Sequence, residues 1–439
     1  MLIVFRTAPI ILQDFSQTRC KMKKSTYANL YSRSSNTMKS SEIRELLKLL
    51  NSPDMISFAG GLPNPDAFPI EKMKPIVEHV MQTHARDALQ YGTTEGHNKL
   101  RDVIARGMGQ QYGAPQALSN IMITNGSQQG LDLISKIFLN PGDKVLTANP
   151  TYLGAIMAFQ AHEAQISAIA LDEQGIIPEL LEDKLEYMEQ RKEQAKFLYL
   201  VPTFQNPTGV TIPLKRREKI YDIICRHDLI LIEDDPYGLL RFEGKREPLI
   251  KSMDDENRVI YLGTFSKILA PGFRTGWIAA HEEIIRKATI AKQAQDLCTN
   301  NFGQYCIFEA IYHDILFPHI KEIITIYKEK RDLMIDALKE FFPKEVRWNK
   351  PQGGLFLWLV LPEFMSALTM LPRAIENNVA YVTGEPFFPN GGGHNTMRLN
   401  YSFASNDQIK VGIERLSHVI KNVISENTGG IAEDFVSIP

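Results

Sequence analysis

Tyr261-Leu262-Gly263-Thr264-Phe265-Ser266-Lys267, with Arg274 seven residues further on, is the stretch that decides the fold class and suggests a ligand. Its apolar beginning predicts a buried strand, and its polar end lies where that strand opens into a loop. The hydroxyls of Thr264 and Ser266 and the guanidinium of Arg274 can together hold a dianionic phosphate beside the amine of Lys267. A lysine after a strand is usually a solvated loop charge, so the motif alone leaves both interpretations open.

An amine next to a phosphate site meets the needs of pyridoxal 5'-phosphate (PLP). The aldehyde of this cofactor forms a Schiff base with a lysine, while neighbouring groups hold its phosphate. The sequence therefore predicts that Lys267 is a catalytic residue and that Thr264, Ser266 and Arg274 bind the cofactor phosphate.

A second polar site follows the apolar run Leu229-Ile230-Leu231, in Ile232-Glu233-Asp234-Asp235-Pro236-Tyr237. A carboxylate at Asp234 can pair with the pyridine nitrogen of PLP and keep it protonated, which makes the ring an electron sink. Tyr237 can donate a hydrogen bond to the phenolic oxygen of the same ring. The alternative is an acidic turn without a ligand, in which Asp235-Pro236 ends the strand.

Two further strands end in polar residues of the same kind. Asn206, in Asn206-Pro207-Thr208-Gly209, follows an apolar run, and its amide can bond a phenolate oxygen and a substrate carboxylate together. Ser127 and Gln128 lie at the start of a helix, where free backbone N–H groups and the Ser127 hydroxyl form an anion site for the cofactor. The alternatives are an ordinary Asn-Pro turn and a serine N-cap without a ligand.

Apolar runs alternate with helical patterns through the middle of the chain. Strands are expected near residues 121–124, 144–148, 165–170, 197–202, 229–233, 259–263 and 276–280. Strands that alternate with helices indicate an α/β fold with a mostly parallel, covered sheet. Ligands of such sheets collect at the strand ends, so Ser127, Asn206, Asp234 and Lys267 are predicted to share one site.

The C-terminal third follows a different pattern. Residues 355–360 and 396–401 read as strands and residues 407–423 as a helix, which together indicate a smaller lobe. A long helical stretch from about 302 to 342 leads into this lobe and is expected to break near Pro318.

These motifs, together with Met55-Ile56-Ser57-Phe58-Ala59-Gly60-Gly61-Leu62-Pro63-Asn64-Pro65, resemble the class I/II aminotransferases of PLP fold type I. Within that family the chain is similar to the 2-aminoadipate and kynurenine aminotransferase group, from about residue 41 to about residue 423. The resemblance implies a large PLP-binding domain with a mostly parallel seven-stranded sheet and a smaller α/β domain. The implied boundaries are 71–319 for the large domain, 41–70 with 320–439 for the small domain, and 1–40 for an N-terminal arm.

The resemblance also assigns residues that the strand pattern does not. Tyr152 corresponds to the aromatic residue that stacks on the pyridine ring, and Tyr91 to a tyrosine that reaches the phosphate of the neighbouring subunit of a homodimer. Arg398 corresponds to the arginine that grips the substrate α-carboxylate, and Gly61 is expected to border the same substrate. Arg44 aligns with a mobile arginine that contacts a distal carboxylate, and its alternative is an exposed helix charge.

The implied function is transfer of an amino group from an L-amino acid, such as 2-aminoadipate or an aromatic amino acid, to 2-oxoglutarate by a ping-pong mechanism. Lys267, Asp234 and Tyr237 are the expected catalytic residues. The same fold serves carbon–sulfur lyases and decarboxylases, which share the lysine and the aspartate. A non-enzymatic PLP-sensing regulator is a further alternative, but the roughly 40 residues before the fold are too few for a DNA-binding domain.

Composition agrees with a two-lobed enzyme that acts on small molecules. The 439 residues are 44% hydrophobic and carry a formal net charge of −2, which indicates no nucleic-acid partner. No run approaches the about 20 apolar residues of a membrane span. The four cysteines lack paired or metal-ligand spacing, which predicts free thiols in the cytoplasm and no metal site. Basic residues outnumber the single acid before residue 25, so an organellar presequence stays open.

Overall fold

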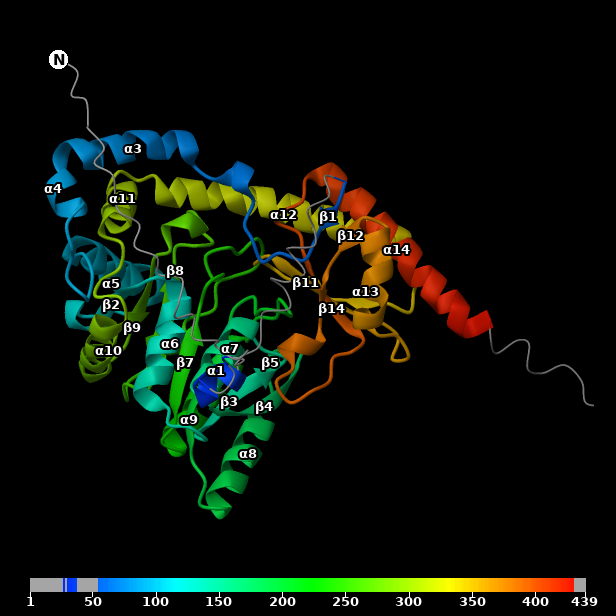
Figure 1. The fold of residues 1–439 in the computed structure, drawn as a ribbon, viewed down its shortest axis with the longest axis horizontal. Helices are drawn as coiled ribbons and strands as arrows, with labels where there is room; N and C mark the ends of the chain where they lie inside the picture. The colour runs from blue at the N-terminus through cyan, green and yellow to red at the C-terminus, as the bar shows by residue number, and fades with distance from the viewer. Residues whose placement is uncertain (1–26, 28–29, 38–53, 430–439) are drawn as a thin grey trace, which may run out of the picture.

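The computed structural model describes residues 27, 30–37 and 54–429, and an eight-stranded sheet lies at its centre (Figure 1). Its strand order is β2-β9-β8-β7-β6-β3-β4-β5. The bounds are β2 (Ile121–Thr124), β3 (Lys144–Asn149), β4 (Gln165–Asp172), β5 (Gly175–Ile176), β6 (Ala195–Leu200), β7 (Ile230–Asp234), β8 (Val259–Thr264) and β9 (Gly276–Ala279). Only β9 and β5 run against their neighbours, so the expected mostly parallel sheet is confirmed.

The seven strands expected from the sequence are all present, within two residues of their expected bounds. The sheet gains an eighth strand, β5, which has two residues and pairs antiparallel with the end of β4. A two-residue strand has no periodic pattern, so sequence reasoning could not detect it.

Helices precede, separate and follow these strands. The helices of the described residues are α1 (Arg33–Thr37), α3 (Ile70–Thr83), α4 (Ala85–Ala88), α5 (Asn98–Tyr112), α6 (Gly126–Phe138), α7 (Leu153–Ala161), α8 (Pro178–Gln190), α9 (Leu214–Arg226), α10 (Glu282–Gln295), α11 (Asn301–Tyr312), α12 (Leu316–Phe341), α13 (Ala367–Glu376) and α14 (Asn406–Gly429). None of the helices in this part of the chain combines the length and the apolar character that a bilayer span requires.

Alternate residues of β6 enter two separate cores, one on each face of the sheet. Phe197 and Tyr199 belong to the core that includes residues of α6 and α7, and both rings contact Phe159 edge-on. Leu198 and Leu200 belong to the core that includes residues of α8 and α9. Because side chains alternate across a strand, a run that is apolar at every position requires cover on both faces.

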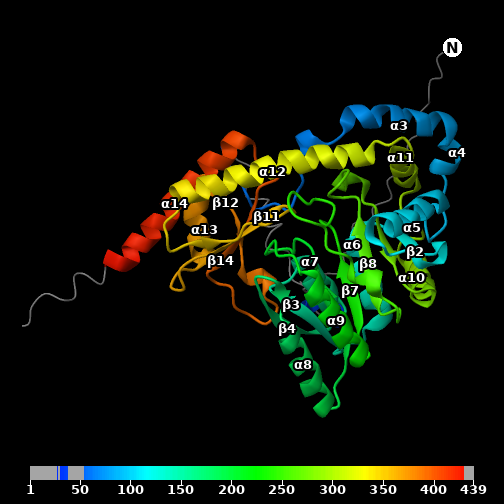
Figure 2. The ribbon, with the colours of Figure 1, turned by 180° about the vertical axis from the view of Figure 1, so that it is seen from behind.

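A smaller sheet forms the second lobe (Figures 1 and 2). It is antiparallel, in the order β10 (Arg347–Trp348), β11 (Phe356–Val360), β14 (Thr396–Asn400) and β13 (Val382–Thr383), with α13 and α14 beside it. A separate pair joins β1 (Ile56–Ser57) in parallel to β12 (Val379–Ala380), so the segment after residue 54 packs with the C-terminal lobe. This pairing supports the small-domain assignment, whose boundaries remain predictions.

The helical stretch after residue 301 breaks earlier than expected. α11 ends at Tyr312, and α12 begins at Leu316. Asp314 takes a positive φ of 51° in the gap between them. Pro318 lies in the first turn of α12, where backbone N–H groups have no intrahelical partner and proline is tolerated. The expected interruption at Pro318 is therefore wrong by a few residues.

A buried ion pair anchors α9 to the sheet. Arg217 and Glu233 are both fully buried, with 3.8 Å between Nη1 and Oε1. Arg217 also donates to the carbonyls of Ile212, Pro248 and Pro202. Burial raises the pKa of Glu233 to about 7, although Arg217 acts in the opposite direction. Removing the arginine would leave a buried carboxylate without its cation.

We expect Arg217→Leu to lower the free energy of unfolding by about 3–5 kcal/mol, because it leaves Glu233 buried and uncompensated. Chemical denaturation followed by circular dichroism measures this loss. Lys219→Leu, on the same helix, is the control, since Lys219 forms an exposed ion pair with Glu179 and its loss should cost about 0–1 kcal/mol. Equal stabilities of the two variants would contradict the account.

Candidate active site

The predicted residues gather at one edge of the large sheet. Asn206 follows β6, Asp234 ends β7 and Lys267 follows β8, and these three strands are adjacent and parallel. β2, which precedes Ser127, runs in the same direction because β9 between β2 and β8 is antiparallel to both. The strand ends therefore meet at one place, as the sequence predicted.

Thr264, Ser266 and Arg274 form a polar cradle beside the start of α6. The Thr264 hydroxyl donates to Ser266 Oγ at 3.0 Å, and Arg274 Nη1 lies 3.5 Å from the same oxygen. A Cβ at Gly126 would lie 2.6 Å from Arg274 Nη2, so a larger residue would displace the guanidinium. Arg274 forms no ion pair with a carboxylate among the described residues, which leaves its charge for an anion.

Lys267 points from the end of β8 toward the small lobe. Its Nζ donates to the Gly61 carbonyl at 2.8 Å. Burial lowers the pKa of Lys267 to about 8, and the charges of Arg398 and Arg274 act in the same direction. About a tenth of the amine is therefore neutral at pH 7, a far larger share than for an unperturbed lysine, and the neutral form is the one that acts as a nucleophile or a base.

Three consecutive acids end β7, and only one of them has a free oxygen. Glu233 accepts backbone N–H bonds from residues 250 and 251, and Asp235 accepts from the Gly238 N–H and the Tyr261 hydroxyl. Asp234 Oδ2 accepts from the Tyr199 hydroxyl at 2.8 Å, whereas the buried Oδ1 has no partner among the residues that the structure describes.

The unpartnered Oδ1 fits a cationic donor such as a protonated pyridine nitrogen. Burial raises the pKa of Asp234 to about 7, and the neighbouring Asp235 adds to the rise, while the Tyr199 bond opposes it. A buried carboxylate with an open acceptor costs free energy unless a donor satisfies it. The donor set of this edge of the sheet therefore fits PLP, for which Asp234 would hold the ring nitrogen, the cradle the phosphate and Lys267 the aldehyde.

Tyr199 is a residue of this site that the sequence analysis missed. It lies in the middle of β6, fully buried, and its hydroxyl orients Asp234. A tyrosine inside an otherwise apolar central strand needs a hydrogen-bond partner, which was the available signal. The pairing of Tyr199 with Ile232 across β6 and β7 determines which carboxylate the Tyr199 hydroxyl bonds to. The sequence does not specify that register.

Arg398, in β14, is a buried cation. Nη1 donates to Asn206 Oδ1 at 2.8 Å and Nη2 to the Ala59 carbonyl at 2.9 Å, while Nε has no partner in the described part of the chain. The guanidinium carbon lies 4.2 Å from the centre of the Phe356 ring and 5.2 Å from that of Phe387. Burial lowers the pKa of Arg398 to about 10. Among the described residues no carboxylate forms an ion pair with it.

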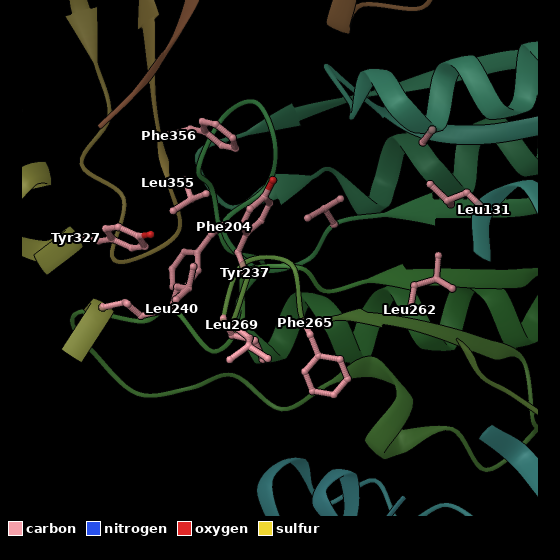
Figure 3. Close-up of a cluster of buried hydrophobic side chains, with 14 of the residues drawn as sticks. Leu131, Phe204, Tyr237, Leu240, Leu262, Phe265, Leu269, Tyr327, Leu355 and Phe356 are labelled. Atoms are coloured by element: carbon pink, nitrogen blue, oxygen red, sulfur yellow. The ribbon is translucent and has the colours of Figure 1, made fainter. Parts of the chain in front are cut away.

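Tyr237 and Asn206 connect the cofactor side of the site to this arginine. Tyr237 is buried, hydrogen-bonds to Asn206, and its ring contacts Phe356 edge-on with 5.7 Å between centroids. Figure 3 shows Tyr237 in the apolar cluster that joins loops of the large lobe to Leu355 and Phe356 of the small lobe. Burial raises the pKa of the Tyr237 phenol, so the hydroxyl remains a donor.

Ser127 and Gln128 lie in the first turn of α6, beside the cradle, and Gln128 bonds to Tyr152. The N-cap of α6 is Asn125, so the alternative of Ser127 as an N-cap is wrong. Gln128 donates to the Gly154 carbonyl and accepts from the Tyr152 hydroxyl at 3.3 Å. These bonds fix Tyr152, which is the N-cap residue of α7.

One predicted residue lies apart from this cluster. Tyr91 is 77% exposed, and Asn301 holds its loop through bonds to the carbonyls of Asp87 and Gln90. An exposed tyrosine is compatible with a role in a neighbouring subunit, which remains a prediction. Arg44 lies outside the described residues.

Comparison with known proteins gives consistent matches. Residues 55–416 match the family model "Aminotransferase class I and II". The chain is 48% identical over 395 residues to "Aromatic-amino-acid aminotransferase 1" of Thermococcus litoralis, covering 90% of this chain and 95% of that protein.

Two solved structures are similar over nearly their whole length. The kynurenine aminotransferase of Pyrococcus horikoshii, in complex with PMP, has 48% identity and a TM-score of 0.88, covering 91% of this chain and 99% of that one. The alpha-aminoadipate aminotransferase of Thermus thermophilus, complexed with N-(5'-phosphopyridoxyl)-L-leucine, has 37% identity and a TM-score of 0.84, covering 91% and 100%.

The lowered pKa of Lys267 gives a prediction for the cofactor-free protein. The rate of covalent PLP capture, followed by absorbance, should rise with pH around a midpoint near 8 rather than 10.5, because only the neutral amine attacks. In Arg398→Gln the midpoint should move upward, since a cation that disfavours the protonated lysine is gone. Arg373→Gln, at an exposed ion pair with Glu426, should leave it unchanged. A wild-type midpoint near 10.5 would contradict the account.

Proposed function

The chain belongs to the class I and II aminotransferases, and from that premise we propose that it transfers the amino group of aromatic amino acids, kynurenine or 2-aminoadipate to 2-oxoglutarate. The expected family, type I fold, aminotransferase activity and PLP cofactor are confirmed. The substrates are our proposal, supported by the names of the similar proteins and by the chemistry of one buried cation, Arg398.

The observation that carries the proposal is Arg398. A guanidinium that is 2% exposed, flanked by two aromatic rings and without a carboxylate partner among the described residues, is costly unless an anion binds it. A carboxylate accepts two parallel bonds from such a group. The α-carboxylate is common to all amino acid and 2-oxo acid substrates, so one arginine serves both halves of the reaction.

The proposed catalytic roles follow from the atoms that are free. When bound, PLP supplies a protonated ring that withdraws electrons from the substrate α-carbon. Asp234 Oδ1 accepts from the ring nitrogen and keeps it charged, and Tyr237 and Asn206 donate at the phenolic oxygen. Lys267 Nζ carries the proton that the α-carbon loses, since its lowered pKa suits both the base and the acid role.

The remaining assignments concern the two ends of the cofactor. Ser127, with Thr264, Ser266 and Arg274, is proposed to bind the phosphate. Gln128 acts through its bonds to Tyr152, whose ring is proposed to cover the pyridine. Tyr91 would complete the phosphate site of the neighbouring subunit in a homodimer.

Substrate breadth is proposed to arise at the wall beside Arg398. Gly61 leaves room there, because a Cβ would lie 3.5 Å from Phe356 Cζ and 3.9 Å from Arg398 Nη2. An aromatic side chain can pack against the phenylalanine, whereas an acidic one needs a second cation. Arg44 is the proposed source of that cation.

The alternative functions have less support. The relatives described above, at 37–48% identity, carry aminotransferase names. Two further relatives, HTH-type transcriptional regulators of Bacillus subtilis, are only 28% identical, and the match covers 77% and 75% of their length. A cytoplasmic location remains a prediction.

The half-reaction tests the proposed activity. Adding phenylalanine, kynurenine or 2-aminoadipate alone to the PLP-loaded protein should bleach the visible absorbance of the cofactor, and 2-oxoglutarate should restore it. A transferase returns the cofactor to its starting form only with the second substrate, whereas a lyase or decarboxylase turns over with the amino acid alone. Release of ammonia or carbon dioxide without 2-oxoglutarate would contradict the proposal, as would bleaching by none of the three amino acids.

Arg398→Ala should lower kcat/KM for every accepted amino acid by about 30-fold to several thousandfold, because losing a buried charged contact costs roughly 2–5 kcal/mol. Steady-state kinetics measure the ratio, and cofactor absorbance checks that PLP still binds. Arg373→Ala, which removes only an exposed ion pair, is the control and should keep near-native efficiency. Near-native efficiency of Arg398→Ala itself would refute the role.

A further inference from the structure

A second cluster of titratable side chains lies away from the active site, between α3, α4 and α11. It consists of His79 in α3, His84 at the junction of α3 and α4, Glu309 in α11 and His313 at the end of α11. The nearest atoms of the three imidazoles lie 3.8, 3.4 and 3.3 Å from the Glu309 carboxylate oxygens, in that order.

Glu309 is the unusual member of this cluster. Its side chain is 6% exposed, and the three histidines are its only ion-pair partners among the described residues. No side chain or backbone N–H in this part of the chain donates a hydrogen bond to it, because the imidazole contacts are longer or less well aligned than such bonds require. Buried carboxylates are normally hydrogen-bonded, paired or bound to metal.

The distances between the imidazole nitrogens and the Glu309 carboxylate suit a shared metal ion better than direct hydrogen bonds. Ligands at about 2.0–2.2 Å in a tetrahedron lie about 3.3–3.5 Å from one another. The ligand atoms of His79, His84 and Glu309 are all within 4.8 Å of each other. The rings of His84 and His313 stand nearly perpendicular to that of His79, at 83° and 85°, so the nitrogens approach the carboxylate from different directions.

We propose that His79, His84 and Glu309 bind one Zn²⁺ ion per chain as a structural site, and that a rotation of His313, whose Nε2 lies 3.3 Å from Glu309 Oε2, supplies the fourth ligand. Three neutral imidazoles and one carboxylate form a donor set that zinc favours over calcium or magnesium. Four protein ligands leave no open position for a reaction. Bound zinc would supply the positive charge that the buried Glu309 lacks.

The ion would fasten helices that are distant in the sequence. α3 and α11 already pack together, and His84 is the residue from which α4 begins. Seven residues after His84 comes Tyr91, whose loop is held to the start of α11 by Asn301. Zinc at one end of α11 and Asn301 at the other would fix the segment between them as a unit.

The surroundings permit metal entry but reduce its affinity. The cluster lines a cavity of about 780 Å³ that it shares with Lys99, Asp102 and Arg106. His79 and His313 are 41% and 48% exposed, so an ion can reach the site without unfolding. The two nearby cations oppose a divalent ion, and Asp102, which is paired with Arg106, offsets part of their effect.

The expected absence of a metal site rested on cysteine spacing, and this cluster contains no cysteine. Its ligands form two local pairs, His79 with His84 and Glu309 with His313, which are more than 200 residues apart. Only the packing of α3 against α11 brings the pairs together.

Zinc binding by the PLP-loaded protein tests the proposal. After treatment with a chelator, the protein is dialysed against about 10 μM ZnCl₂ and bound metal is counted by mass spectrometry. We expect one zinc per chain in the wild type. Glu309→Gln and His84→Gln should each bind more than about 100-fold more weakly, since losing a ligand exceeds the 10- to 100-fold effect of an outer-shell partner. Zinc should raise the wild-type Tm and leave that of the variants unchanged.

A control variant, a further ligand variant and a second metal keep the result interpretable. His162→Gln removes a histidine–carboxylate pair with Asp132 outside the cluster and should retain the zinc. His313→Gln changes a half-exposed side chain at a helix end, so it provides a ligand variant that still folds if Glu309→Gln does not. Co²⁺ in place of zinc should give the visible bands of a tetrahedral site in the wild type and not in His313→Gln. Zinc absent from the wild type, or retained equally by the ligand variants, would overturn the proposal.

Discussion

A single unpartnered carboxylate oxygen is the constraint on which the active site depends. Asp234 Oδ1 lies buried at the end of β7, while Tyr199 occupies the other oxygen and the flanking acids are satisfied by other groups. The site is electrostatically incomplete without a cationic donor at that position. A protonated pyridine ring supplies such a donor. The parallel strands on either side of β7 determine the positions of the other groups that bind the cofactor.

Three cations of the active site complement the negative groups of PLP and of its substrate. Lys267, Arg274 and Arg398 have no carboxylate partners among the described residues, although burial disfavours the charge of Lys267 and Arg398. Such groups weaken the free protein and strengthen binding of a ligand that carries a phosphate and a carboxylate. The pair Arg217 and Glu233 shows the contrasting arrangement, in which opposite charges satisfy each other within the fold.

The sequence predicted those features of the fold and the site that local residue patterns encode. Apolar runs located the seven main strands, and polar residues just after them located Asn206, Asp234 and Lys267. It missed the bond from Tyr199 to Asp234, which depends on the register of two strands, the two-residue β5, which is too short for a periodic pattern, and the junction before α12, which is made by a positive φ at Asp314. Arg398 was found only through resemblance, because nothing near β14 in the sequence distinguishes it from other arginines. The histidine cluster was missed because its two halves meet only through helix packing.

In the loaded protein we expect PLP to be bound covalently to Lys267 with its ring nitrogen at Asp234. Borohydride reduction of the PLP-loaded protein, followed by protease digestion and mass spectrometry, reveals where the cofactor is attached. We expect one phosphopyridoxyl group per chain, on the peptide that contains Lys267, with labelling greatly reduced in Asp234→Ala at limiting cofactor. A label on another lysine, or no label at all, would contradict it.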